Sequence, residues 1–188
     1  MTFPSHDQDS APEASKPLLA QSQKAFGRLP GLHKVLAESP QAYEGYQLLH
    51  KLFTETDFDA DELTVVWQSI NVEHACHYCV PAHTGIAKMM KVSDDITEAL
   101  RNETALPTAK LEALRAFTVQ MVRERGNVSQ AQMKAFFDAG YGHRAVLDVI
   151  LGLAQKTMSN YVNHVAETPV DEVFHPLAWK RGDTPLKV

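Results

Sequence analysis

The sequence lacks the charge excess and the long apolar segments that mark nucleic-acid-binding and membrane proteins. Its 188 residues carry a formal net charge of -5, so no basic surface for nucleic acid is expected. The longest apolar runs, such as Val149 to Leu151, are far shorter than the roughly 20 residues that a membrane helix needs. Residues 1–17 are polar and lack the layout of a signal peptide. We therefore expect a cytoplasmic protein without nucleic-acid or membrane partners.

Sustained alternation of apolar and polar residues, which would indicate β-strands, is also missing. Apolar residues instead recur at helical spacing in segments that short breaks separate. With 44% apolar and 22% charged residues, the chain can bury one sizeable core. The sequence predicts an all-α fold, a compact multi-helix bundle. We expect a single helical domain over residues 18–188, preceded by a disordered arm over residues 1–17.

Local signals predict where several helices begin. Ser39 precedes Pro40, and Ser93 precedes two aspartates, as is typical of helix N-termini. Two capping boxes are expected, one formed by Asp59 with Glu62 and the other by Ser129 with Gln132.

The last part of the chain is unusually apolar. A helix over about 143–165 is apolar nearly all round, which is typical of a helix that is buried or lies in an interface. The tail over 169–188 carries Phe174, Leu177 and Trp179, and we expect it to pack on a neighbour's surface. These features predict a homo-oligomer.

Cysteine is scarce, and its placement is informative. Both cysteines, Cys76 and Cys79, lie three positions apart, a spacing that allows them to meet on one face of a helical turn. Pro81 favours a helix that begins near Tyr78 and runs to about Met90. Cys79 then lies in the first turn and Cys76 just before it, where free backbone N–H groups favour a thiolate. We therefore expect a reactive pair, in which one thiol attacks and the other resolves.

Two further residues complete the predicted catalytic site. His83 follows Cys79 by four positions, so it shares a helix face with that thiol and can accept its proton. Glu73 precedes Cys76 by three positions and can hold the imidazole or a water molecule. The predicted catalytic residues are Cys79, Cys76, His83 and Glu73, and no cofactor or metal is expected.

Three other interpretations of the cysteines compete with a reactive pair. They could fill an apolar core, form a structural disulfide, or bind zinc with His83 and either His77 or His74. The close spacing and the expected reducing compartment argue against each of these. The alternative function is a non-catalytic protein, a metal-binding or redox-sensing scaffold that uses the Cys/His cluster.

The segment around the cysteines resembles the alkylhydroperoxidase D-like family, which also includes carboxymuconolactone decarboxylases. The match consists of six residues in order: Glu73, Cys76, Tyr78, Cys79, Ala82 and His83. Weaker similarity runs from about Lys16 through Trp179. The resemblance implies a compact all-α bundle. In this family the second cysteine attacks a peroxide, the first resolves it as a disulfide, and the histidine belongs to a proton relay completed by a glutamate.

Carried over, the resemblance implies that Cys79 attacks, Cys76 resolves and His83 relays. The implied function is that of a thiol-dependent peroxidase, an antioxidant oxidoreductase that takes electrons from a lipoamide- or thioredoxin-like dithiol. It also implies a dimer, trimer or hexamer. Two positions depart from the family pattern: Tyr78 replaces a histidine, and Thr64 replaces the relay glutamate. Glu73 or Glu62 is then expected to complete the relay. Decarboxylases lack the paired thiols, so decarboxylation is not implied.

Overall fold

The computed structural model describes residues 3–182, and these residues form helices, turns and loops without a strand. The predicted all-α fold is therefore confirmed. In chain order the elements are η1 (Glu13–Ser15), α1 (Lys16–Phe26), α2 (Gly31–Leu36), α3 (Pro40–Thr54), α4 (Ala60–Glu73), α5 (Cys79–Met89), α6 (Asp94–Arg101), α7 (Ala109–Arg123), α8 (Gln130–Asp138), α9 (His143–Val165) and η2 (Glu172–Leu177). None of these helices has the length and apolar character of a membrane span.

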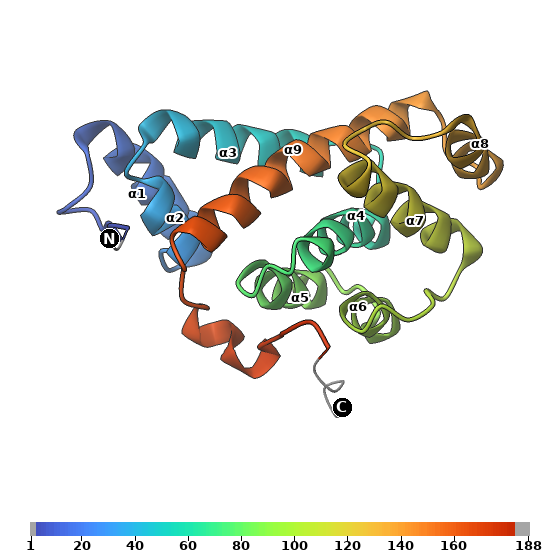
Figure 1. Cartoon of the computed structure of the whole chain (residues 1–188). Coiled ribbons are helices and arrows are strands. Elements are labelled where there is room, and N and C mark those ends of the chain that lie inside the picture. Colours follow the sequence, from blue (N-terminus) through green and yellow to red (C-terminus); the bar gives the residue numbers. More distant parts are fainter. Residues whose placement is uncertain (1–2, 183–188) are drawn as a thin grey trace.

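Helix α4 lies at the centre of the fold, and α5, α6, α7 and α9 pack around it (Figure 1). Helices α3 and α9 run side by side across one face of the molecule. Helices α1 and α2 lie at the end of the molecule that faces away from α7 and α8 (Figure 1). The site described below forms where α5 meets α3, α9 and the two N-terminal helices.

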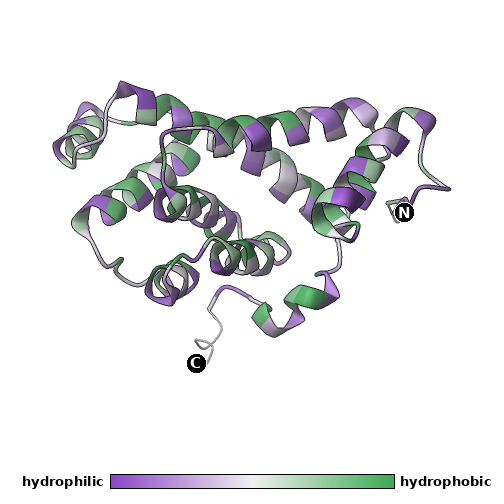
Figure 2. Cartoon of the chain, turned by 180° about the vertical axis from the view of Figure 1, so that it is seen from behind, coloured by the Kyte–Doolittle hydropathy of each residue, from purple (hydrophilic) through white to green (hydrophobic). Residues whose placement is uncertain are grey.

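The predicted helix starts are confirmed at the level of hydrogen bonds. The Ser39 side chain accepts from the Ala42 amide, and both predicted capping boxes form. Each box satisfies two backbone N–H groups that an uncapped helix start leaves free. Most helices carry both hydrophobic and hydrophilic residues in each turn, as expected for amphipathic helices (Figure 2).

Close packing of α9 depends on a glycine. A Cβ atom at Gly152 would lie 2.7 Å from Phe53 and 2.9 Å from Val66, which is closer than side-chain carbons approach one another. The absence of a side chain therefore lets α9 approach α3 and α4 closely. This approach brings the polar side chains of the second half of α9 to the cysteines.

The N-terminal arm, which is predicted to be disordered, makes contacts with the segment after α2. Ala11 and Ser15 are buried, and the Ser15 hydroxyl donates to the Ala37 carbonyl oxygen at 2.6 Å. His6 contacts the Glu38 carboxylate at 2.6 Å. The described part of the arm, residues 3–17, thus contacts the segment just after α2 through one buried and one exposed hydrogen bond, which its polar composition did not indicate. Residues 1–2 lie outside the described residues.

The described part of the tail packs on α5 and α6 of its own chain, as its path beneath α5 in Figure 1 shows. Its contact with a neighbour's surface stays a prediction. Trp179 is buried with Val72 and Val80, and its indole N–H donates to the Arg101 carbonyl at 2.9 Å. Residues 183–188 lie outside the described residues.

Candidate active site

The two thiols lie at the junction between α4 and α5. Ala75 adopts a left-handed φ of 51°, and the Cys76 amide donates to the Asn71 carbonyl at 2.9 Å. This hydrogen bond is typical of a Schellman-type helix end, and it turns the chain sharply after α4. Cys79 is the first residue of α5, and its amide donates to Cys76 Sγ at 3.3 Å. Both thiols are free, and the predicted start of the helix is confirmed within one residue.

A cavity of about 270 Å³ opens beside Cys79. Cys79 and His83 line this cavity, whereas Cys76 does not and is fully buried. Most of the remaining wall is apolar, formed by side chains that include Phe26, Pro30, Leu32, Ile86, Met89 and Phe174. A small molecule that enters the cavity can therefore meet the sulfur of Cys79 but not that of Cys76.

The surroundings of Cys79 favour its thiolate. Burial opposes ionisation, but the neighbouring Cys76 thiol and the charge of Lys156 outweigh it and lower the pKa of Cys79 to about 6. The Asn163 amide adds to this effect by donating to Cys79 Sγ at 3.3 Å. The hydrogen bond of the Cys76 thiol to Cys79, then burial and the Cys79 charge, raise the pKa of Cys76 well above its usual value. Cys79 is therefore the ionised member of the pair and Cys76 the protonated one.

A network of buried amides fixes α4 against α5 and α9. The Gln68 amide donates to the Val80 carbonyl at 3.1 Å, and Asn71 donates to Gln68 Oε1 at 3.0 Å. Asn160 on α9 donates to Asn71 Oδ1 at 3.0 Å. Since buried amides are costly unless they are paired, this network favours one arrangement of the three helices and so fixes the position of Cys79.

His83 has an unexpected partner. Its Nε2 lies 2.9 Å from Nζ of Lys156, a buried lysine on α9, and its ring packs on Trp67 with centroids 4.9 Å apart. His83 Nδ1 is buried and has no hydrogen-bond partner within the described chain. Burial, and next the charge of Lys156, hold the pKa of His83 well below its usual value, so the ring is neutral.

A second neutral imidazole lines the cavity from α3. His50 Nδ1 accepts from the Gln155 side-chain amide at 3.1 Å, and Gln155 Oε1 accepts from the Trp67 indole at 2.7 Å. Burial and the charge of Lys156 lower the pKa of His50 to about 4. His50 therefore adds no positive charge to the cavity near neutral pH.

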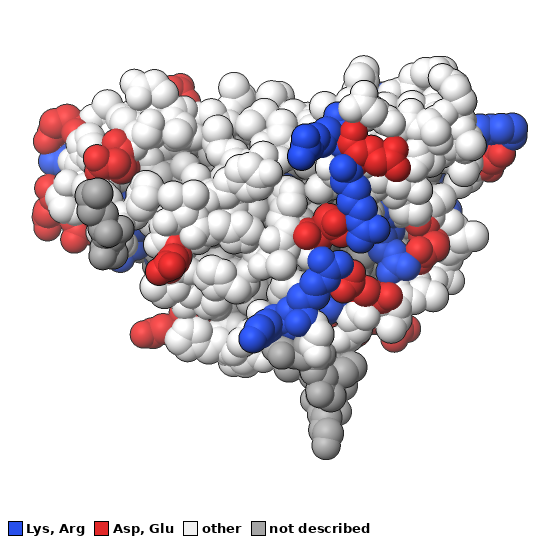
Figure 3. Space-filling view, in the orientation of Figure 1, with Lys and Arg blue, Asp and Glu red and all other residues white. Residues whose placement is uncertain are grey.

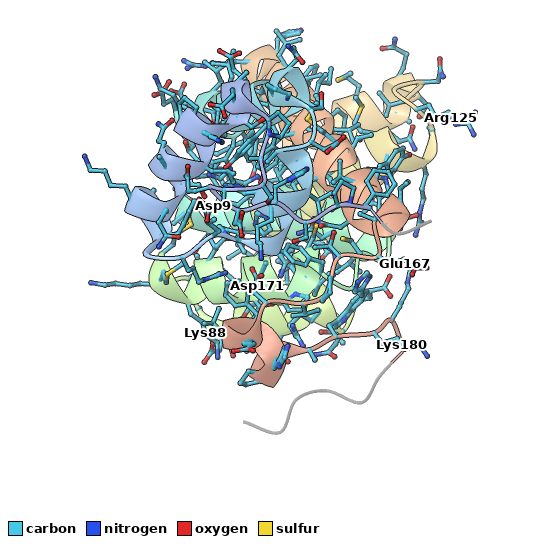
Figure 4. The ribbon with its side chains drawn as sticks, turned by 90° about the vertical axis from the view of Figure 1, so that its left-hand side faces the viewer. Asp9, Lys88, Arg125, Glu167, Asp171 and Lys180 are labelled. Atoms are coloured by element: carbon cyan, nitrogen blue, oxygen red, sulfur yellow. The ribbon has the colours of Figure 1, made fainter. Side chains whose placement is uncertain are left out.

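Tyr78 ties the mouth of the cavity together. Its hydroxyl donates to Asp171 Oδ2 at 2.8 Å and accepts from the Leu32 amide at 3.2 Å. Asp171 also pairs with Arg28 at 2.8 Å and accepts from the Gly31 amide at 2.9 Å. Figure 4 shows Asp171 where the C-terminal segment passes the N-terminal helices. Tyr78, at the position where the sequence departs from the resemblance, thus joins the start of α5, helix α2 and the C-terminal segment around the cavity.

The structure does not bring either candidate glutamate to this cavity. Glu73 pairs with Arg123, with both carboxylate oxygens 2.8 Å from guanidinium nitrogens, and borders a different hollow beside α7. Glu62 caps α4, accepts from Tyr141 and pairs with Lys110 at 2.8 Å. A relay from His83 to Glu73 or Glu62 has no counterpart in this arrangement.

The other histidines of the cysteine segment are also engaged elsewhere. His74 contacts Asn160 Oδ1 at 2.9 Å, and His77 contacts the Thr168 carbonyl at 3.1 Å. Among residues 3–182, no cluster of three or more histidine, cysteine, aspartate or glutamate side chains is arranged to hold a metal ion. The zinc interpretation finds no support in this geometry.

Lys156 and Asn163 are site residues that the sequence interpretation missed. Lys156 interrupts an otherwise apolar stretch of α9, and a lysine at a position expected to be buried was the available signal. Asn163 lies on the same helix, and no local pattern in the sequence singles it out. Its contact with Cys79 follows only from the packing of α9 against α5.

Comparison with known proteins supports the fold. No protein-family model matches the chain, and no curated protein matches it. Solved structures do: the alkylhydroperoxidase AhpD core of a peroxidase-related protein from Ralstonia eutropha JMP134 has a TM-score of 0.78 at 18% identity, covering 97% of this chain and 96% of that one. A peroxidase-related protein from Silicibacter sp. TM1040 has a TM-score of 0.79 at 17% identity, covering 93% of each chain.

A third structure of the same fold is that of an enzyme described as a debrominase. It is a cysteine-to-alanine variant of the debrominase Bmp8 in complex with 2,3,4-tribromopyrrole, with a TM-score of 0.76 at 14% identity, covering 93% of this chain and 94% of that one. At such low identities the likeness extends to the fold alone. The alkylhydroperoxidase D-like fold implied by the six-residue resemblance is thereby confirmed.

Proposed function

We propose that this protein is a thiol-dependent peroxidase that protects against hydroperoxides by means of the Cys76/Cys79 pair. The observation that carries the proposal is the position of Cys79, which lines a cavity while its thiolate is favoured by Lys156 and Asn163. A thiolate is the nucleophilic form of cysteine, and attack requires that the substrate can reach it.

The proposed reaction begins with attack of the Cys79 thiolate on the outer oxygen of a hydroperoxide. A sulfur–oxygen bond forms, the oxygen–oxygen bond breaks, and the departing alkoxide takes up one proton and leaves as an alcohol. Cys79 is left as a sulfenic acid. The Cys76 thiol then attacks the sulfenic sulfur, and the released hydroxide leaves as water with the proton of Cys76. The product is a Cys76–Cys79 disulfide.

The burial of the two sulfurs supports this division of roles. Cys79 lines the cavity, whereas Cys76 is fully buried behind it and keeps its proton. A dithiol donor of the lipoamide or thioredoxin kind would then reduce the disulfide, and its sulfur would have to reach Cys79 through the cavity. Cys76 would be released as the thiol.

Turnover with a small peroxide and a small dithiol tests the proposal. The wild-type protein is expected to consume tert-butyl hydroperoxide in the presence of dithiothreitol, whereas Cys79→Ser should show only the rate of dithiothreitol alone. The exposed substitution Lys88→Met is a matched control that should keep wild-type turnover. Wild-type turnover no faster than the protein-free reaction would show that the proposal is wrong.

The debrominase of the same fold favours a second candidate function, thiol-dependent reductive debromination. The apolar cavity of about 270 Å³ has room for a compact ring as well as for an alkyl hydroperoxide. Release of bromide from 2,3,4-tribromopyrrole in the presence of dithiothreitol tests this candidate. Release that depends on Cys79 and is faster than turnover of tert-butyl hydroperoxide would favour debromination over peroxide reduction.

The homo-oligomer stays a prediction, and it now rests on apolar residues of α3 and α9 instead of on the tail. The tail packs on its own chain, but α3 and α9 expose the side chains of Leu48, Leu52, Leu147 and Ile150. Figure 3 shows that charged side chains gather over the α6 and α7 side of the visible face and are sparse over α3 and the middle of α9. Light scattering at micromolar concentration should give a mass above that of one chain, and a stable monomer would contradict the prediction.

A further inference from the structure

Lys156 is a buried cation without a carboxylate partner. Its side chain is 1% exposed, and none of the salt bridges in the described chain includes it. A buried ammonium group is costly unless an opposite charge lies close to it. Burial lowers the pKa of Lys156, and the negative charge that opposes this loss of the proton comes from the thiols, chiefly from Cys79. Lys156 and Cys79 therefore stabilise each other as an ammonium and a thiolate.

The contact between Lys156 and His83 determines where the imidazole carries its proton. An ammonium group has three donors and no acceptor, so Lys156 Nζ must donate to His83 Nε2 across their distance of 2.9 Å. Nε2 then presents its lone pair, and the ring proton lies on Nδ1. His83 Nδ1 is a buried donor without a partner in the described chain, on a residue that lines the cavity. A buried donor without a partner is rare, and beside the cavity a bound ligand can accept its hydrogen bond.

We propose that Lys156 and His83 form the proton-donating pair of this site. In this arrangement Lys156 keeps Cys79 ionised, and His83 passes a proton to the leaving oxygen of the substrate. The inference rests on the proposed peroxidase function and changes the role predicted for His83 from proton acceptor to proton donor. It also assigns Lys156 the position in the relay that the sequence interpretation gave to Glu73.

The proton transfers balance the reaction. As Cys79 attacks and the oxygen–oxygen bond breaks, the leaving oxygen takes the Nδ1 proton of His83. His83 Nε2 takes a proton from Lys156 at the same time. The thiolate and ammonium become a sulfenic acid and a neutral amine, so the buried site carries no net charge before or after the step. When a dithiol later reduces the Cys76–Cys79 disulfide, its two protons restore the Cys76 thiol and the Lys156 ammonium.

The other titratable groups around Lys156 and His83 do not change the charges assigned to Lys156 and Cys79. His50 and Tyr46 approach from α3, Cys76 from the turn before α5, and Cys79 from the start of α5. His50 is neutral, and burial raises the pKa of Tyr46, so neither carries charge near neutral pH. Cys79 is therefore the anion, and Lys156 the cation, at the base of the cavity.

The tautomer of His83 can be measured without any peroxide. In protein with ¹⁵N-labelled histidine, the two ring nitrogens of His83 give different chemical shifts according to which one carries the proton. We expect a protonated Nδ1 and an unprotonated Nε2 at pH 7, with His83→Gln used to assign the signals. A proton on Nε2 would overturn the proposal, because Lys156 could then not donate to that nitrogen.

The role of Lys156 is tested with Lys156→Met, a substitution of similar length that removes the charge. Because a buried charge is replaced by an apolar side chain, we expect the variant to fold, which thermal unfolding checks. At pH 7 its alkylation by iodoacetamide at Cys79 should be about tenfold or more slower than in the wild type, since the thiolate fraction falls. Lys88→Met, which removes an exposed lysine of α5, should react at the wild-type rate. Unchanged alkylation in Lys156→Met would overturn the proposal.

Two peroxides with different leaving groups distinguish the two roles proposed for Lys156, which are proton donation to the leaving oxygen and stabilisation of the Cys79 thiolate. Reduction of tert-butyl hydroperoxide releases a strongly basic alkoxide, which needs a proton as it leaves. Reduction of peracetic acid releases a stable carboxylate, which does not. Per Cys79 thiolate, Lys156→Met should lose about 100-fold in its reaction with tert-butyl hydroperoxide and much less with peracetic acid. Equal losses would contradict the relay. If the wild-type protein reacts with neither peroxide, the proposed function and the relay are wrong, whereas the tautomer and alkylation results still decide the charge role of Lys156.

Discussion

The two ends of α4 lie in cores of opposite character. Near its start, α4 packs with α7 and the α8 to α9 connection around a stack of aromatic rings, in which Phe117 and Phe136 have centroids 4.1 Å apart and Phe136 and Tyr141 4.5 Å apart. Near its end, α4 meets α5 and α9 through buried amides, beside the contact between Lys156 of α9 and His83 of α5. The first region buries apolar rings, and the second buries groups that need hydrogen bonds.

This difference separates stability from chemistry within one bundle. Apolar packing supplies most of the stabilisation of a domain, whereas a buried polar network is favourable only when its members are paired. In the second region the network surrounds Cys79, and two of its buried atoms, His83 Nδ1 and Asn163 Oδ1, have no hydrogen-bond partner among residues 3–182. Substitutions in the first region should therefore lower stability, and those in the second should alter thiol reactivity.

The largest expected effect on stability comes from the aromatic stack. Phe117→Ala should lower the free energy of unfolding by about 3–5 kcal/mol, because it removes a fully buried ring and leaves a cavity. Urea unfolding measures this loss, and Val165→Ala, at an exposed position, should change it by less than about 0.5 kcal/mol. Under conditions where Phe117→Ala remains folded, its rate of Cys79 alkylation should match the wild type. A large change in that rate would break the separation between the two regions.

The second expected effect concerns pH. Because the pKa of Cys79 is about 6, its alkylation by iodoacetamide should be nearly constant above pH 7. Below pH 6 the rate should fall about tenfold per pH unit, since only the thiolate reacts. Mass spectrometry of the Cys79 peptide follows the reaction. A midpoint near the usual thiol pKa of about 8.5 would show that Lys156 and the helix start do not favour the thiolate.

A smaller change is expected from Asn163. Asn163→Ala removes the amide that donates to Cys79 Sγ, a hydrogen bond of about 1 to 3 kcal/mol when its acceptor is charged. The midpoint of Cys79 alkylation should therefore shift to higher pH. His164→Ala alters the adjacent exposed residue of α9 and should leave the midpoint unchanged. If both variants titrate as the wild type does, the contact of Asn163 contributes nothing to the thiolate.

The smallest effect is expected at Glu73, which the sequence interpretation had placed in the relay. Glu73→Gln weakens a pair with Arg123, whose side chain is 58% exposed, so the loss of stability should stay below about 1 kcal/mol. Turnover of tert-butyl hydroperoxide should remain at the wild-type rate. A loss of turnover similar to that of Lys156→Met would restore Glu73 to the relay and contradict the arrangement described for the site.

Sequence reasoning succeeded where the signal is local. The Asp59–Glu62 and Ser129–Gln132 capping boxes involve residues three positions apart, and such contacts form whenever the helix forms. Cys79 and His83 likewise share one helix, α5, so their common face followed from spacing alone.

The remaining site residues depend on packing between distant segments. Lys156 lies 73 residues from His83 in the sequence, and their contact exists because α9 crosses α5. Glu73 illustrates the opposite error, because it is close to Cys76 in sequence but separated from the cavity in space. The left-handed turn at Ala75 directs the chain away after α4, so the spacing between Glu73 and Cys76 is not that of a continuous helix.

Trapping of the oxidised sulfur tests the central claim most directly. The Cys76→Ser and Cys79→Ser proteins are each treated with one equivalent of tert-butyl hydroperoxide in the presence of dimedone, which labels sulfenic acids, and the labelled peptides are identified by mass spectrometry. We expect rapid labelling of Cys79 in Cys76→Ser and none above background of Cys76 in Cys79→Ser. Labelling of Cys76 at the rate expected for Cys79, or no labelling of either protein, would contradict the assignment of Cys79 as the attacking thiol.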